Sequence, residues 1–223
     1  MSTHTIALLG GTGPQGKGLA YRFARQGHRV IIGTRNPETA LPIVAEIVER
    51  TDGRAEVSAD TNAAAAAEAD VVVIAVPYAA HAPLIEELAP VLEGKVVIDC
   101  VNPLAFDAQG PHSLEIEDRS AAEEAQRLAP GARVVGAFHL VSAVNLWSEE
   151  DFLDDEDILV SGGDAEAKAL VLHLAAAVSG REGIDVGALR MSRYIEPLTA
   201  MIISINKKYK VRAGVKISGL TRD

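Results

Sequence analysis

Three glycines near the amino terminus are spaced so that the chain can approach phosphate groups closely. Gly11, Gly13 and Gly16 form a G-x-G-x-x-G pattern directly after an apolar run and at the start of a helical pattern. In that context the first glycine permits a tight turn, the second admits a pyrophosphate, and the third lets helix and strand pack closely. The amino end of the helix would add free N–H groups and a positive dipole end. The pattern predicts a dinucleotide-binding loop, the alternative being an ordinary glycine turn. The members of this loop are Gly11, Thr12, Gly13, Pro14, Gln15 and Gly16.

The end of the second apolar run distinguishes between two dinucleotides. NAD-binding proteins usually carry Asp or Glu there, which accepts a hydrogen bond from a ribose hydroxyl. This chain has Thr34 and Arg35 instead. A guanidinium group holds a phosphate through a planar fork of N–H donors and keeps its charge at all ordinary pH values. These residues predict a clamp for the 2′-phosphate of NADP, and the alternative is a solvated loop arginine.

Three later loops should line the rest of the cleft, because ligands of open α/β sheets bind outside the carboxyl ends of the strands. The loops cover residues 76–78, 101–103 and 137–143, and they contain no lysine and no recognisable proton relay. His139 is their only imidazole, and a histidine in such a place more often packs or forms hydrogen bonds than acts as an acid or base. His81 lies nearby and is assigned no role. We therefore expect no catalytic acid–base residue.

The elements that must hold these residues alternate regularly along the chain. Short apolar runs rich in Val and Ile alternate with helical patterns, which is typical of a parallel sheet covered on both faces. We therefore predict an α/β, Rossmann-type fold with a doubly wound, mostly parallel sheet. The expected strands are 5–9, 29–32, 71–76, 95–100, 133–135 and 157–160, with weaker ones at 55–58 and 184–186. The expected helices are 15–26, 37–50, 61–69, 120–128 and 164–179.

The carboxyl-terminal part departs from this alternation. Residues 188–209 predict one long helix that Pro197 should kink or interrupt. We expect an NADP-binding Rossmann domain over residues 1–181 and a small C-terminal helical element over residues 182–223 that closes the substrate cleft. The apolar face of the long helix predicts a homodimer, since the sheet domain alone would not cover it.

Composition excludes several classes of function. The chain has 223 residues, a formal net charge of −10, one cysteine and 4% aromatic residues. The acidic balance argues against a nucleic-acid-binding protein, and one cysteine excludes an internal disulfide. No apolar run approaches the roughly 20 residues of a membrane span, and the amino terminus lacks the pattern of a signal peptide. The acidic run at residues 149–157 lacks the spacing of a calcium loop, so we expect no metal site. The expected location is the cytoplasm, with no nucleic-acid or membrane partner.

The sequence resembles the NADPH-dependent reductases of the deazaflavin coenzyme F-420 (F420), also called F-420:NADP oxidoreductases. The most specific match is Leu-Leu-Gly-Gly-Thr-Gly-x-x-Gly-Lys-Gly-Leu-Ala at residues 8–20. Further matches follow in order at residues 27–28, 33–35, 119–123, 137–139, 192–199 and 214–216. The resemblance implies an oxidoreductase that passes a hydride directly and reversibly between NADP(H) and F420. Such a transfer needs positioning more than acid–base groups, in agreement with the missing proton relay.

The resemblance also implies how the cleft is divided. The pyrophosphate would bind at residues 12–15, and the 2′-phosphate at Thr34 and Arg35. The nicotinamide end would be lined by Val76, Asn102 and Ala143. The deazaflavin would be approached by His139, Val141, Ala213 and Val215. Two positions depart from the archaeal members of the family, because Thr39 stands where they carry lysine and Ser142 where they carry proline.

Two other functions are compatible with the same fold, because a fold alone does not establish chemistry. One is an NADP-dependent reductase of an imine or a small carbonyl compound, which would usually need a proton donor in the cleft. The other is a non-catalytic NADP-sensing module that regulates a partner. A sensor would bind the cofactor without turnover of any hydride acceptor.

Overall fold

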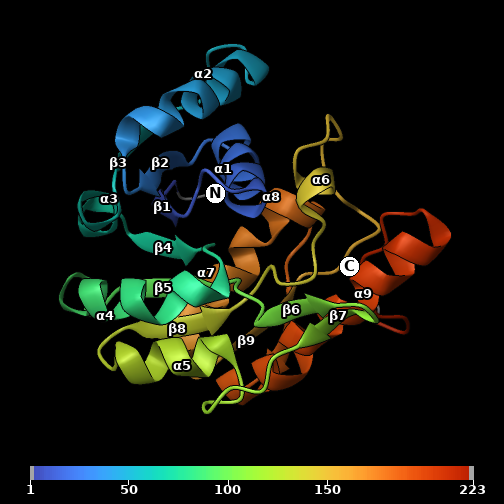
Figure 1. The fold of residues 1–223 in the computed structure, drawn as a ribbon. Helices are drawn as coiled ribbons and strands as arrows, with labels where there is room; N and C mark the ends of the chain where they lie inside the picture. Colours follow the sequence, from blue (N-terminus) through green and yellow to red (C-terminus); the bar gives the residue numbers. More distant parts are fainter. Residues whose placement is uncertain (1–2, 221–223) are drawn as a thin grey trace.

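A computed structural model describes residues 3–220 and shows one large sheet with helices on both faces (Figure 1). The strand order is β10-β9-β8-β5-β4-β1-β2-β3. The strands from β3 to β8 in this order run parallel, whereas β9 is antiparallel to β8 and β10 is parallel to β9. This confirms the predicted Rossmann-type, doubly wound and mostly parallel fold. The strands are β1 Thr5–Leu9, β2 Arg29–Thr34, β3 Val57–Thr61, β4 Val71–Ile74, β5 Val96–Asp99, β8 Arg133–Gly136, β9 Leu159–Gly162 and β10 Ile184–Gly187.

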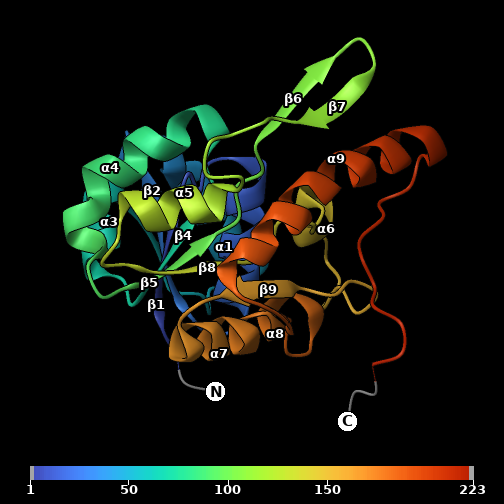
Figure 2. The ribbon, with the colours of Figure 1, turned by 90° about the horizontal axis from the view of Figure 1, so that it is seen from below.

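The central strands are mostly apolar because each faces two cores. Ile6 and Leu8 of β1 lie in the core shared with α1, α2, α7 and α8, whereas Ala7 and Leu9 lie in the core shared with α3, α4 and α5. Figure 2 shows these two helical layers on opposite sides of the sheet. Strand β1 lies between β2 and β4, so the chain order reverses there. A reversal of this kind opens the crevice in which α/β proteins bind ligands.

The expected helices are present, and further elements appear that the sequence pattern did not predict. The larger ones are the helix α4 and the hairpin of β6 and β7, which projects from the body in Figure 2. Helix α4 contains Pro83 and Pro90. Because proline is unfavourable within helices, the sequence pattern did not predict a helix here. The expected helices are α1 Pro14–Arg25, α2 Leu41–Arg50 after the 3₁₀ turn η1 Pro37–Ala40, α3 Asn62–Glu68, α5 Ala121–Leu128, α7 Ala165–Leu174 and α8 Ala176–Ser179. The others are η2 Tyr78–Ala80, α4 His81–Leu92, β6 Leu104–Asp107, β7 Gly110–Ser113 and α6 Ala143–Leu146.

The C-terminal helix starts later than expected and is not broken at its proline. A 3₁₀ turn, η3 Leu189–Met191, precedes α9 Ser192–Tyr209, and the helix continues through Pro197. Pro197 has no N–H to donate to the carbonyl oxygen of Arg193, so α9 lacks one hydrogen bond near its start, and the helix continues on both sides of it. Strand β10 joins the main sheet, and the sheet therefore extends past the boundary expected at residue 181.

Three polar side chains of α9 attach it to the carboxyl edge of the sheet. The Ser192 hydroxyl lies 2.8 Å from that of Ser161 on β9. Glu196 accepts hydrogen bonds at the amino end of α5, and the Thr199 hydroxyl donates to the carbonyl oxygen of His139 at 3.2 Å. These three residues are spaced four and three apart, so they share one face of the helix. The helix is therefore fixed against the edge where ligands are expected.

No helix within residues 3–220 is both long and apolar enough to cross a bilayer.

Gly16 should be intolerant of any side chain because backbone surrounds it. A Cβ atom there would lie 2.6 Å from Gly11 Cα and 2.7 Å from the Gly10 carbonyl oxygen. Since backbone cannot rotate away as a side chain can, Gly16→Ala should lower the free energy of unfolding by about 1–3 kcal/mol. Gly163→Ala is the matched control, because no atom lies within 4 Å of its Cβ position. Urea unfolding would measure both, and equal stability of the two variants would contradict the close packing.

Candidate functional site

The glycine loop between β1 and α1 leaves the amino end of α1 open. Gly10 has a φ of +79°, and the amide of Gly13 donates to its carbonyl oxygen at 3.0 Å, which closes the turn. Helix α1 begins at Pro14 with Gly13 as its N-cap, without a side-chain cap and without an acidic residue in its first turn. A Cβ atom on Gly13 would contact only the Gly10 carbonyl oxygen, at 3.4 Å. The outer side of the loop is therefore free to receive a pyrophosphate.

The side chain of Gln15 forms a hydrogen bond within the protein. Its side-chain amide donates to the carbonyl oxygen of Phe138 at 3.0 Å. Phe138 follows β8 and has a φ of +63°, which is uncommon for a residue with a Cβ atom. The Gln15 side chain thus connects the glycine loop to the loop after β8 and holds that loop in its unusual turn.

The predicted phosphate clamp, Thr34 and Arg35, lies at the carboxyl end of β2, and its guanidinium group has no partner in the part of the chain that the structure describes. Within residues 3–220, Arg35 is exposed and forms neither a hydrogen bond nor an ion pair. Asn36 caps the 3₁₀ turn η1 through a hydrogen bond from the Glu38 amide to its side-chain oxygen at 3.2 Å. The Thr39 hydroxyl donates to the Asn36 carbonyl oxygen at 2.6 Å. The guanidinium group is therefore available to a ligand phosphate, next to the Thr34 hydroxyl.

The three residues expected at the nicotinamide end follow β4, β5 and β8, which are neighbours in the sheet. Val76 is half-buried beside Gly10, since a Cβ atom on Gly10 would lie 2.7 Å from Val76 Cγ1. Asn102 donates from Nδ2 to the His139 carbonyl oxygen at 2.9 Å, and its buried Oδ1 accepts no hydrogen bond within residues 3–220. Ala143 is the first residue of α6 and is half-buried.

Helix α6 is held in place by the buried guanidinium of Arg22 on α1. Arg22 donates to the carbonyl oxygens of Asn145, Leu146 and Glu150 at 2.7–2.8 Å. The close approach needs Gly18, because a Cβ atom there would lie 2.5 Å from Leu146 Cβ. The helix that carries the phosphate-binding loop therefore also places the loop that carries Ala143.

The ring of His139 points into the protein rather than into an open cleft. Its side chain is fully buried, and Nε2 lies 3.9 Å from Glu196 Oε1. Neither ring nitrogen forms a hydrogen bond within residues 3–220, and burial lowers the pKa of His139 to about 4. The imidazole is therefore neutral at neutral pH, and the His139 carbonyl oxygen accepts hydrogen bonds from Asn102 and Thr199.

The other residues expected near the deazaflavin have different surroundings. Val141 is buried in the main core. Ala213 donates from its amide to Asn206 Oδ1 at 2.7 Å and borders a cavity. Val215 packs beside Leu140 on the cluster that supports α9. The predicted substrate contacts therefore come from two segments of chain, one after β8 and one after α9.

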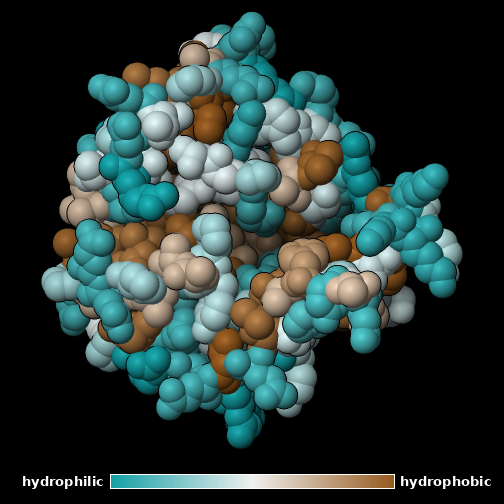
Figure 3. Space-filling view, in the orientation of Figure 1, coloured by the Kyte–Doolittle hydropathy of each residue, from teal (hydrophilic) through white to brown (hydrophobic). Residues whose placement is uncertain are grey.

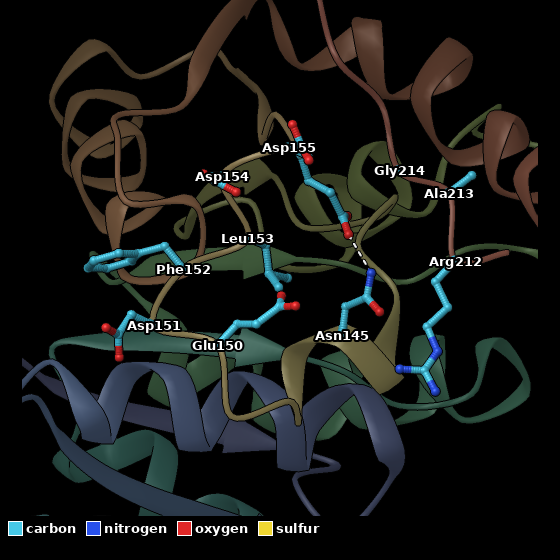
Figure 4. A pocket seen from close by; sticks show the side chains of 11 residues that line it. Asn145, Glu150, Asp151, Phe152, Leu153, Asp154, Asp155, Arg212, Ala213 and Gly214 are labelled. Carbon is cyan, nitrogen blue, oxygen red and sulfur yellow. Dashed lines mark hydrogen bonds between the residues drawn. The ribbon is translucent and has the colours of Figure 1, made fainter.

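The cavity beside Ala213 has a volume of about 770 Å³ and lies between the acidic loop and the C-terminal segment (Figure 4). The acidic run at residues 149–157 forms one wall. Asn145 Nδ2 donates to Glu156 Oε1 at 2.7 Å, and burial raises the pKa of Glu156. Among residues 3–220 no group of three or more His, Cys, Asp or Glu could hold a metal ion. The lining residues are Asn145, Glu150, Asp151, Phe152, Leu153, Asp154, Asp155, Glu156, Arg212, Ala213 and Gly214.

A buried ionic network at the same edge of the sheet was missed by the sequence reasoning. His81 lies between two carboxylates, with Nε2 2.6 Å from Asp99 Oδ2 and Nδ1 2.7 Å from Glu124 Oε2. The Tyr78 hydroxyl donates to Glu124 Oε1 at 3.1 Å. The usable signal was Asp99 itself, since a carboxylate at the end of an apolar strand must find a partner.

The network shifts the protonation of several of its members. Burial opposes a charged imidazole, but Asp99 and Glu124 outweigh it and raise the pKa of His81 to about 9. Burial, together with Glu124, raises the pKa of Tyr78 to about 12. Burial and the nearby Asp99 raise the pKa of Glu196 to about 8, although its carboxylate accepts from the amide of Ala121 at 2.7 Å and from that of Ala122.

Several known proteins with similar sequences share one description. A family model described as NADP oxidoreductase, coenzyme F420-dependent, matches residues 5–103. The F420-dependent NADP reductase of Methanothermobacter marburgensis is 38% identical over 96% of this chain and 98% of the relative. That of Methanocaldococcus jannaschii is 39% identical over 96% of this chain and 98% of the relative. A solved structure from Arthrobacter sp. FB24, provisionally assigned as an F420-dependent NADP reductase, superimposes with a TM-score of 0.77 at 31% identity, covering 94% of this chain and 96% of the other.

The raised pKa values of His81 and Glu196 should make the protein less stable as the pH rises above neutral. The pKa of His81 is about 9 in the fold against 6.5 as a free group, and that of Glu196 is about 8 against 4.5. The folded chain therefore retains protons that the unfolded chain has lost. The free energy of unfolding should fall by up to about 1.4 kcal/mol per pH unit for each group, until the pH passes its folded pKa.

Chemical denaturation at several pH values between about 6.5 and about 9.5 would measure this slope. Glu196→Gln should remove the part of the decrease in the free energy of unfolding that Glu196 causes below about pH 8, and leave the part that His81 causes. The buried His28 and His139 oppose this fall up to about pH 7.5, because their pKa values are about 4 in the fold against 6.5 as free groups, so the slope is read above that pH. Stability that rises over this range would contradict the assignment.

Proposed function

The chain belongs to the family of F420-dependent NADP reductases, and we propose that it transfers a hydride reversibly between NADP(H) and coenzyme F420. The observation that carries this proposal is the identity of 36–39% to reductases of that name over 96% of the chain. The open glycine loop and the unused Arg35, at one edge of the sheet, support it. The charge of −10 and the single cysteine agree with the further proposals that the protein acts in the cytoplasm and has no nucleic-acid partner.

The residues at the sheet edge fit an NADP molecule. The uncapped amino end of α1 offers N–H donors and a positive dipole end to the pyrophosphate, and no acidic side chain in the first turn opposes it. Arg35 and the Thr34 hydroxyl can hold the 2′-phosphate. Thr39 adds no charge to this clamp, so the preference for NADP over NAD depends mainly on one guanidinium group.

The nicotinamide would lie among Val76, Asn102 and Ala143. Asn102 uses its Nδ2 on the His139 carbonyl oxygen and keeps Oδ1 as an acceptor. A buried acceptor without a donor costs about 1–3 kcal/mol, and an amide N–H of a ligand would relieve that cost. Val76 supplies apolar surface directly against the glycine loop.

With both coenzymes bound, a hydride passes from nicotinamide carbon 4 to deazaflavin carbon 5, a step that depends on positioning. The chain's own contribution is to bring two binding surfaces together. One consists of the loops after β1, β2, β4, β5 and β8. The other is the C-terminal element after β10, in which Ala213 and Val215 approach the deazaflavin. We assign no acid–base role to His139, whose buried ring is uncharged at neutral pH. Together, His139 and Val141 support the wall of the deazaflavin site from inside the protein.

We further propose that the protein is a homodimer formed through α9. Tyr194, Met201, Ile205 and Tyr209 are exposed on this helix, and Phe106 is exposed on the adjacent hairpin. Their spacing on α9 places them along one side of the helix. The surface seen in Figure 3 is partly apolar over the hairpin and α9, beside a hollow near the centre of that face. A surface of this kind is covered in most soluble proteins.

Removing the Arg35 side chain should selectively weaken the binding of NADPH. Charge-assisted hydrogen bonds to a phosphate contribute about 1.5–3 kcal/mol, so Arg35→Ala should raise the KM for NADPH by about 10–100-fold. The rate with NADH, which lacks the phosphate, should stay the same. The measurement mixes protein, NADPH and oxidised F420 and follows the loss of the visible absorbance of the deazaflavin.

Arg54→Ala is the matched control, because Arg54 is an exposed arginine that pairs with Asp52 outside this edge. Its kinetics should equal those of the unmodified protein. NADPH binding without bleaching of F420 would contradict the proposed reaction and favour an imine or carbonyl reductase or an NADP-sensing module.

A charge placed on the exposed side of α9 should dissociate the dimer. Met201→Glu puts a carboxylate at a side chain that is 58% exposed in the single chain, and this charge would be buried in the interface. Leu41→Glu is the matched control, because Leu41 is 56% exposed on α2, at the other end of the sheet. Sedimentation should show a monomer for Met201→Glu and a dimer for the control. An unmodified protein that sediments as a monomer would overturn the proposal.

A further inference from the structure

His81 is a buried charged group that the hydride transfer does not use. Its side chain has no exposed surface, and each ring nitrogen faces a carboxylate oxygen, of Asp99 at 2.6 Å and of Glu124 at 2.7 Å. An ionised carboxylate can only accept hydrogen bonds, so both ring nitrogens donate and the ring is an imidazolium. The three groups come from α4, β5 and α5, and they meet at the carboxyl edge of the sheet.

Asp99 connects this imidazolium to the loop after β5. Its Oδ2 faces His81, while its Oδ1 accepts a hydrogen bond from the amide of Val101 at 2.9 Å. The residue after Val101 is Asn102, whose Oδ1 is the unpaired acceptor at the nicotinamide end. The direction in which the chain leaves β5 is therefore fixed by a carboxylate that His81 in turn orients.

Glu124 connects the same imidazolium to the loop after β4. Its Oε1 accepts from the Tyr78 hydroxyl at 3.1 Å, and the Tyr78 ring stacks on the His81 ring with centroids 5.9 Å apart. Tyr78 follows Val76 by two residues in that loop. One imidazolium therefore holds two loops from adjacent strands, and each loop carries a residue expected at the nicotinamide.

We propose that His81 is a positioning residue for the nicotinamide end of the cofactor site. The imidazolium keeps Asp99 and Glu124 close together and so fixes the places of Asn102 and Val76. Without it, the buried Asp99 carboxylate and the half-buried Glu124 carboxylate would face each other, and their repulsion would move the loops apart. The proposal rests on the proposed binding of NADP(H) and is independent of the identity of the hydride acceptor.

The competing explanation is that His81 only anchors α4 to the sheet. A buried ion pair often gives little net stability compared with apolar side chains, because desolvation offsets the attraction. An anchor predicts a loss of stability without selective weakening of one end of the ligand. A positioning residue predicts weaker binding of the nicotinamide end alone.

The experiment compares two ligands on His81→Gln and on a control variant. NADPH occupies both ends of the site, whereas adenosine 2′,5′-bisphosphate occupies only the phosphate clamp. We expect His81→Gln to weaken the binding of NADPH by about ten-fold and to leave the affinity for adenosine 2′,5′-bisphosphate unchanged. The control is His28→Gln, since His28 is also buried (5% exposed) but contacts His4 and Phe23 instead of the loops. It should lower stability without changing the ratio of the two affinities.

Tyr78→Phe is a second variant that removes a single hydroxyl and tests the same network if His81→Gln does not fold. It should weaken the binding of NADPH by about three-fold and leave the affinity for the bisphosphate unchanged. An unchanged ratio of affinities in the folded variants would overturn the proposal and leave an anchor of α4. A protein that binds NADPH but does not reduce F420 would refute the proposed reaction, while the ratio would still test His81.

Discussion

The close packing of α1 against the end of β1 is the constraint on which the rest of the site depends. Gly16 has to lie against the backbone of Gly10 and Gly11, and only that arrangement points the open end of α1 at the edge of the sheet. From this position the helix reaches two further segments. Gln15 binds the turn at Phe138, and Arg22 binds the end of α6. One helix therefore sets both the phosphate site and the loops expected around the nicotinamide.

Much of this arrangement follows from the sequence because it depends on local rules. The glycine spacing, the apolar strands and the Thr34–Arg35 pair can each be interpreted within a few residues, and the resemblance covers the chain in order. The orientation of His139 could not be predicted in this way. Phe138 adopts a left-handed φ, which turns the next side chain inward, and this turn depends on a hydrogen bond from Gln15, far away in the sequence.

The ionic network was equally hidden, since its members are separated in the chain and meet only when α4 and α5 pack against β5. Asp99, Glu124 and His81 each have an ordinary appearance in their own segment, and α4 itself was obscured by its prolines. The polar face of α9 is a similar case. Glu196 and Thr199 read as part of an amphipathic helix, yet they bind the amino end of α5 and the backbone of His139. Long-range pairing of polar groups thus completes a site whose outline is local.

The hairpin of β6 and β7 connects the loop after β5 with the C-terminal helix. The chain passes from Asn102 through Pro103 straight into β6, and the amide of Leu114, just after β7, returns a hydrogen bond to the Pro103 carbonyl oxygen at 2.9 Å. Strand β7 lies along α9, as both ribbon views show (Figures 1 and 2). The hairpin therefore joins the loop that carries Asn102 to α9 along a path that lies outside the two cores of the sheet.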